Sequence, residues 1–237
     1  FIKKSVSIKE NLNSIQKKIC QSANESGRSP QEIKLIAVSK TKPIEMVKEA
    51  ISSNQIIFGE NYVQEALDKI KKIGKIKEIE WHFLGHLQKN KAKFCPGNFQ
   101  WLHTLDSIEL SQKIEHHCTL NNKRMNVLIQ VNLSKEYSKS GLKELADVQR
   151  VAEKIYLCKS LKLRGLMTIP KPDLGEIKTR KIFEKIRNWK EILQNDFKTS
   201  EISELSMGMT ADYTWAIKEG ATMVRLGTAI FGSRENG

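Results

Sequence analysis

The sequence predicts an α/β fold, a single (β/α)8 barrel of the TIM-barrel class with one helix before its first strand. Eight short apolar runs recur along the 237 residues, and most of them are continuously apolar, as expected for strands buried on both faces. Segments with helical periodicity lie between the runs. The runs start about every 27 residues between positions 35 and 223, which suits a strand, a helix and two short loops.

The first element is a helix predicted over residues 8–26, where Ile8, Leu12, Ile15 and Ile19 share one face. Gly27 and Pro30 follow it closely and favour its end there. The predicted strands are LIAVS (35–39), IIFG (56–59), WHFLG (81–85), WLHTL (101–105), NVLIQVN (126–132), LRGLMTI (163–169), ISELSM (202–207) and MVRLGTAIF (223–231).

The segments between the later runs have the spacing of amphipathic helices. Ser107 is a candidate N-cap and Gly220 a candidate helix stop. The sequence ends six residues after the eighth run, so we expect no eighth helix and expect helix 8–26 to take its place. Residues 35–231 form the predicted barrel, and residues 1–237 are interpreted as one domain. The apolar stripes are Ile108, Leu110, Ile114 and Cys118; Leu145, Val148, Ala152 and Ile155; and Ile182, Ile186, Trp189 and Leu193.

Composition limits the classes of protein that this chain can belong to. Hydrophobic residues make up 39% of the chain, which argues against disorder. We find no apolar run of about 18 residues and no signal-peptide core, so we expect neither a membrane span nor a membrane partner. The four cysteines form no CxxC pair, which favours free thiols in a reducing compartment and argues against a zinc site. We therefore expect a cytoplasmic protein.

The net charge of +13 raises the alternative of a basic RNA-associated protein. Basic residues gather at 69–77 and 89–93, but no aromatic residues that could stack on bases lie among them. The alternative therefore rests on charge alone, and we do not expect nucleic acid to be the main partner.

Functional groups of such barrels lie where the strands end, at the C-terminal face. Lys40 directly follows IAVS, so we expect it at the barrel mouth, where burial lowers a lysine pKa and the neutral amine can form a Schiff base. The alternative is one more surface lysine in a lysine-rich chain. Lys42 is the weaker candidate because it lies further into the loop, beside Pro43.

Two glycine-containing segments follow the seventh and eighth runs, where barrels of this class often bind phosphate. Ser206, Met207 and Gly208 precede a predicted helix, and Gly227 and Thr228 lie near the end of the eighth run. Backbone N–H groups in such segments can bind an anion, although they are also compatible with ordinary turns.

Three other polar positions stand out. Arg225 interrupts an apolar strand and needs an acceptor, which could be a structural partner or a bound ligand. Asn61 follows the second strand at the mouth. His82 and His86 share a strand face, but no neighbouring ligand completes a metal site, and we expect none.

Several blocks resemble the pyridoxal phosphate homeostasis proteins, a family related to the barrel half of alanine racemases. The resemblance covers almost the whole chain in order, with Thr210 at a position where the family often has serine. It implies a fold type III pyridoxal phosphate (PLP) barrel. The blocks are IAVSKTKP (36–43), FGENYVQEA (58–66), WHFLGHLQKNK (81–91), VNLSKEYSKSG (131–141), GLMTIP (165–170), SMGMTADY (206–213) and VRLGTAIFG (224–232).

The resemblance also implies roles for particular residues. Lys40 would be the Schiff-base lysine, Arg225 would approach the pyridine nitrogen, and Asn61 would lie beside the cofactor. The phosphate region would be held by Ser206, Met207, Gly208, Gly227 and Thr228.

Two functions remain open for such a site: a cofactor carrier and an amino-acid racemase-like enzyme. An arginine at the ring nitrogen cannot accept a proton and disfavours the electron-sink form of the cofactor. Alanine racemases also add a C-terminal domain whose tyrosine serves as a second base, and the sequence given ends at Gly237 without one. We therefore expect a non-catalytic PLP carrier acting in PLP homeostasis, monomeric, with PLP-dependent apo-enzymes as partners.

Overall fold

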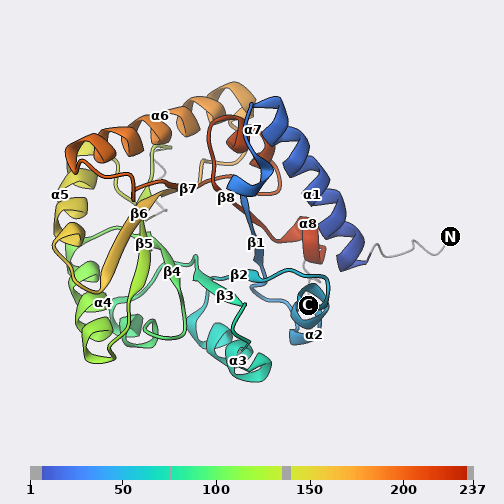
Figure 1. The fold of residues 1–237 in the computed structure, drawn as a ribbon, viewed down its shortest axis with the longest axis horizontal. Helices are drawn as coiled ribbons and strands as arrows, with labels where there is room; N and C mark the ends of the chain where they lie inside the picture. The colour runs from blue at the N-terminus through green and yellow to red at the C-terminus, as the bar shows by residue number, and fades with distance from the viewer. Residues whose placement is uncertain (1–6, 75, 135–139, 234–237) are drawn as a thin grey trace.

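The computed structural model describes residues 7–74, 76–134 and 140–233. Within them, eight parallel strands form a closed barrel in chain order, β1 pairing with β8, and helices surround it (Figure 1). The strands are β1 (Lys34–Val38), β2 (Ile57–Glu60), β3 (Glu80–Phe83), β4 (Trp101–Leu105), β5 (Met125–Val131), β6 (Leu161–Thr168), β7 (Glu204–Ser206) and β8 (Met223–Leu226). The helices are α1 (Ile8–Glu25), α2 (Ile44–Ser52), α3 (Val63–Ile73), α4 (Ile108–Leu120), α5 (Leu145–Tyr156), α6 (Gly175–Asp196), α7 (Tyr213–Lys218) and α8 (Thr228–Phe231), with 3₁₀ turns η1 (Pro30–Glu32) and η2 (Lys89–Phe94).

The continuous apolar character of the strands arises because both of their faces are buried. One set of strand side chains packs against the surrounding helices in the main core. A second, smaller set fills the inside of the barrel and closes it below the mouth. The fold predicted from the sequence is therefore confirmed. The inner set consists of Ile36, Leu84, Trp101, Leu128, Met167 and Met223.

The helix boundaries follow local capping chemistry. Ser7 and Glu10 form a capping box at the start of α1, which ends at Glu25, one residue before the predicted end. The Ser107 hydroxyl accepts a hydrogen bond from the Leu110 N–H at the start of α4, as predicted. Gly220, two residues after α7, adopts φ +99°, a backbone conformation that favours glycine. No helix in the described ranges is long and apolar enough to cross a membrane.

The end of the barrel differs from the prediction in one respect. The eighth strand stops at Leu226, and residues 228–231 form the short helix α8 instead of continuing the strand to Phe231. The reason lies at Gly227, where the backbone turns to φ −115° and ψ −72° after the last pairing of β8 with β1. The eighth helix is therefore shortened and not missing.

Helix α1 covers the space beside this short helix. It lies along α8 and α7 in Figure 1, and its Asn11 amide donates a 2.9 Å hydrogen bond to the Ile230 carbonyl. The expectation that the N-terminal helix takes the place of a missing eighth helix is therefore wrong in part, because α1 packs beside the short helix α8 and does not replace it. This packing supports the segment that carries Gly227 and Thr228.

Candidate functional site

A cavity of about 380 Å³ opens at the C-terminal ends of the strands. It brings together five residues that the sequence singled out: Lys40, Asn61, Arg225, Gly227 and Thr228. Segments following β1, β2, β7 and β8 thus meet in one place, as barrel geometry dictates. The remaining lining residues are Val38, Leu84, Ile169, Met209, Thr210 and Ala211.

The backbone on both sides of Lys40 is fixed by hydrogen bonds. The Ser39 hydroxyl donates to Glu60 at 2.6 Å, and the Ser39 carbonyl accepts from Lys69 Nζ at 2.6 Å. The Thr41 N–H, at a residue with φ +62°, donates to Glu65 at 2.6 Å. Lys40 itself is half-buried at the cavity. The backbone position of Lys40 is therefore fixed by side chains of β2 and α3.

A buried ion pair supports the hydrogen bonds that fix Ser39 and Thr41 on either side of Lys40. Lys69 on α3 bonds to Glu60 at 2.8 Å and Glu65 at 2.6 Å. Burial raises the pKa of Glu60, while the bonds from Lys69 and Ser39 oppose that shift. Glu60 Oε2 has no hydrogen-bond partner among the described residues. The pair lies on the helix side of β2, so it serves the segment around Lys40 and not the cavity itself.

Asn61 is held at the cavity by a close approach of two backbones. A Cβ atom added at Gly85, just after β3, would lie 2.0 Å from the Asn61 carbonyl oxygen. Glycine is therefore required at position 85 for the strand ends to meet as they do.

Arg225 is buried, and two hydrogen bonds to its neighbours fix the orientation of its guanidinium. Its Nη1 donates to the Ser206 hydroxyl at 2.6 Å and its Nη2 to the Thr168 carbonyl at 2.9 Å. Burial lowers the pKa of Arg225 to about 10, and the charge of Asp212 opposes the shift. The guanidinium thus remains charged at neutral pH and lines the cavity from below.

Ser206 connects Arg225 to a row of buried polar side chains inside the barrel. Its hydroxyl lies 2.8 Å from His103 Nδ1, and His103 Nε2 lies 2.8 Å from His82 Nδ1. His82 Nε2 lies 2.7 Å from Glu80 Oε1. Burial lowers the pKa of His82 and of His103, the latter well below its ordinary value.

The residues of the seventh strand end are placed differently from one another. Ser206 is buried on Arg225, Met207 packs in the main core, and the Gly208 carbonyl accepts from the Arg225 N–H at 3.0 Å. None of these three is among the lining residues, whereas Met209 and Thr210 are. Their role at a phosphate stays a prediction, and the structure shows how they support the loop that does reach the cavity.

Sequence reasoning missed several residues that organise this loop and the row beneath it. The Asp212 carboxylate accepts a 2.6 Å bond from the Met209 N–H, and burial raises the pKa of Asp212. His103 and Thr168 were also missed, although a histidine within the apolar run WLHTL is a signal, since a buried polar group needs partners.

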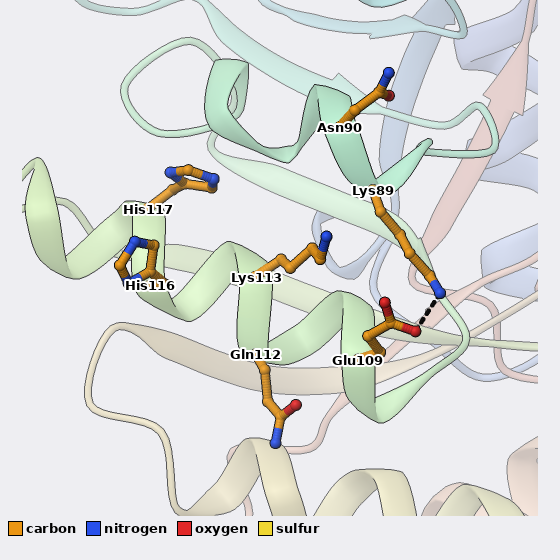
Figure 2. Close-up of a pocket in the computed structure, with 7 residues that line it drawn as sticks. All are labelled: Lys89, Asn90, Glu109, Gln112, Lys113, His116 and His117. Atoms are coloured by element: carbon orange, nitrogen blue, oxygen red, sulfur yellow. Dashed lines mark hydrogen bonds and ion pairs between the residues drawn. The ribbon is translucent and has the colours of Figure 1, made fainter.

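A second hollow, of about 490 Å³, lies between η2 and α4 at the surface (Figure 2). Lys89 and Glu109 form an ion pair there, with Lys113, His116 and His117 further along α4. It is formed by η2 and the outer helix α4 and shares no lining residue with the cavity at Lys40. The candidate site is therefore the cavity at the barrel mouth.

Fold and cavity define a class: parallel (β/α)8 barrels with an amine inside a cavity at the C-terminal ends of the strands. The model of a family described as "Alanine racemase, N-terminal domain" matches residues 7–235. The "Pyridoxal phosphate homeostasis protein" of Vibrio alginolyticus is 43% identical over 97% of this chain and 98% of its own length. The protein of that name from Escherichia coli K12 is 42% identical over 96% of this chain and 97% of its own. The chain belongs to the family of pyridoxal phosphate homeostasis proteins.

Solved structures agree with this assignment. PipY of Synechococcus elongatus, in a structure described as having PLP bound, superposes with a TM-score of 0.85 at 32% identity, over 95% of this chain and 100% of that one. An alanine racemase of Clostridium difficile 630 has a TM-score of 0.75 at 18% identity, over 97% of this chain and 57% of that one, and shares the fold.

Proposed function

We propose that this protein binds pyridoxal 5'-phosphate in the cavity at the barrel mouth and acts in intracellular PLP homeostasis, without efficient catalysis. The observation that carries the proposal is the meeting of Lys40, Arg225 and the Gly227–Thr228 turn around one cavity of about 380 Å³. That volume suits a small ligand. PipY, described as having PLP bound, and the names of the curated relatives support the choice of cofactor.

The donor set fits the chemistry of this cofactor. PLP carries an aldehyde, a phosphate and a ring nitrogen, and it supplies an electron sink when the ring nitrogen is protonated. Lys40 would hold the cofactor through its aldehyde as a Schiff base. Thr210, Gly227 and Thr228 bind the phosphate, with Ser206, Met207 and Gly208 supporting that region. Asn61 lies beside the ring.

Arg225 sets the character of the site. A guanidinium has no acceptor, so it donates to the ring nitrogen and holds that atom unprotonated. This favours storage of the cofactor over reactions that need a strong electron sink. The alternative, a racemase-like enzyme, has the distant fold similarity to alanine racemases in its favour. We further propose delivery to PLP-dependent apo-enzymes in the cytoplasm.

The test of binding is reduction of the PLP-loaded protein with borohydride, followed by peptide mass mapping. We expect the reduced PLP adduct on Lys40 in the wild type and in Lys42→Ala. We expect no adduct in Lys40→Ala. Lys42 is the matched control because its Nζ bonds to the Ser233 carbonyl at 2.8 Å, outside the cavity. An adduct on Lys42, or none, contradicts the proposal.

The test of the carrier role is incubation of the loaded protein with L-alanine and other amino acids while chirality is followed. We expect no turnover in the enzymatic range. Racemisation with kcat above about 1 s⁻¹ would establish the enzyme instead.

A further inference from the structure

The buried polar row beneath the cavity crosses the barrel from one end to the other. Glu80 begins β3 and is 35% exposed at the N-terminal end of the barrel, while Arg225 lines the cavity at the other. His82, His103 and Ser206, all fully buried, connect the two by contacts of 2.6 to 2.8 Å. Residues of β3, β4, β7 and β8 thus form one continuous hydrogen-bonded chain.

The protons of this chain can be assigned from its two ends. Burial alone would raise the pKa of Glu80, but the hydrogen bond from His82 and the positive charge of Lys34 contribute to a net lowering. An ionised Glu80 can only accept, so His82 carries its proton on Nε2. A neutral His82 then accepts at Nδ1, so His103 donates from Nε2.

The Arg225 end of the row gives the same direction of hydrogen bonding. Arg225 can only donate, so the Ser206 oxygen accepts from Nη1. A neutral His103 that donates from Nε2 must accept at Nδ1, and the Ser206 hydroxyl is the donor in range. Every hydrogen bond therefore points from Arg225 toward Glu80, with a cation at one end and a carboxylate at the other. Such aligned chains polarise their members and fix their geometry.

We propose that Glu80, His82, His103 and Ser206 are positioning residues for Arg225, and that they hold its guanidinium toward the cavity from the opposite end of the barrel. The Ser206 hydroxyl proton is committed to His103, so Ser206 acts on Arg225 and not as a phosphate donor. The proposal rests on the proposed function only in placing Arg225 at the cofactor's ring nitrogen.

The first experiment needs no cofactor. Nitrogen-15 NMR of the full-length, histidine-labelled protein at pH 7 should show His82 and His103 neutral, each with its proton on Nε2. Glu80→Gln can donate as well as accept, so the ring nitrogens of His103, which does not touch residue 80, should shift.

Glu204→Gln is the matched control for that experiment. Glu204 begins β7 at the same end of the barrel and bonds to Lys34 and Thr222 instead of a histidine, so His103 should keep its signals. The proposed direction of the hydrogen bonds is contradicted if either ring carries a proton on Nδ1 or is charged at pH 7. Equal shifts in the two variants contradict it as well. The wild-type spectrum decides this even if a variant does not fold.

The second experiment separates the two roles of Ser206. Dissociation constants of PLP and of unphosphorylated pyridoxal are measured for wild type and Ser206→Ala. A positioning role predicts the same loss for both ligands, up to about 10- to 150-fold, as for one hydrogen bond to a charged group. A loss confined to PLP overturns the proposal. Failure of the wild type to bind either ligand contradicts the proposed function. The histidine spectra still test the hydrogen-bonded row from Arg225 to Glu80 in that case.

Discussion

The ammonium of Lys69 lies 2.8 Å from a carboxylate oxygen of Glu60, and both groups are buried beside the segment that follows β1 and carries Lys40. Removing one partner of such a pair leaves an uncompensated buried charge. We expect Lys69→Met to lower the free energy of unfolding by roughly 3–5 kcal/mol, measured by urea titration. The adduct yield at Lys40 should fall as well, because Lys69 also holds the Ser39 carbonyl.

The control for this prediction is on the same helix. Lys72 is exposed, and Lys72→Met should change stability by no more than about 0.5 kcal/mol. Equal effects of the two substitutions would show that the buried pair does not support the site.

The buried histidines predict an acid sensitivity of the fold. The folded-state pKa of His103 lies well below that of the unfolded chain, about 6.5. Between those values the unfolded state binds more protons, so stability falls as pH drops below about 6.5. The expected slope is about 1.4 kcal/mol per pH unit for each such histidine, measured by urea unfolding between pH 7 and 5.

His103→Gln should lower the slope of stability against pH by the contribution of one histidine. Glutamine does not titrate, but it can still donate and accept hydrogen bonds. His116→Gln, an exposed residue of α4, should leave the slope as it is. A steep slope retained in His103→Gln would assign the acid sensitivity to other groups.

The threonines at the cavity should select the phosphate. Thr210 and Thr228 line the cavity on the two segments proposed to bind it. A hydrogen bond to a charged group contributes about 1.5–3 kcal/mol, so Thr228→Ala should weaken PLP binding about 10- to 150-fold. Binding of pyridoxal, which lacks the phosphate, should change little. Parallel losses for both ligands would contradict a phosphate role, and Thr210→Ala provides an independent second measurement.

Gly85 should matter for the site through its backbone neighbour. A Cβ at this position meets the Asn61 carbonyl at 2.0 Å, so Gly85→Ala must displace the segment that carries Asn61. We expect a destabilisation of roughly 1–3 kcal/mol and weakened PLP binding. Gly27→Ala is the control: its φ of +66° makes alanine unfavourable by about 1–2 kcal/mol, but no atom lies within 4 Å and ligand binding should be retained.

The parts of the site that could be predicted from the sequence are those set by position along a strand. Lys40 directly follows one apolar run and Asn61 lies two residues after another, and barrel geometry alone brings such positions to one mouth. Gly227 and Thr228 could be placed for the same reason. The turn of the chain at Gly227 could not, because TAIF is mostly apolar, contains two β-branched residues and is equally compatible with a continuing strand.

The row beneath the cavity depends on contacts that one sequence does not display. Ser206 and His103 are 103 positions apart, and their pairing follows from the register of strands that are not sequence neighbours. The same holds for Arg225 and Thr168. Periodicity showed which strands are buried, but not which polar side chains would meet inside the barrel.

The pairing of β1 with β8 also constrains when the protein can work. Lys34 pairs with Met223, so one edge of the first strand stays unpaired until β8 has been synthesised. Lys40 and Arg225 belong to those two strand ends and meet only at this closing step. The cofactor pocket can therefore form only after β8 has been synthesised, and capture of the ligand is coupled to closure of the barrel.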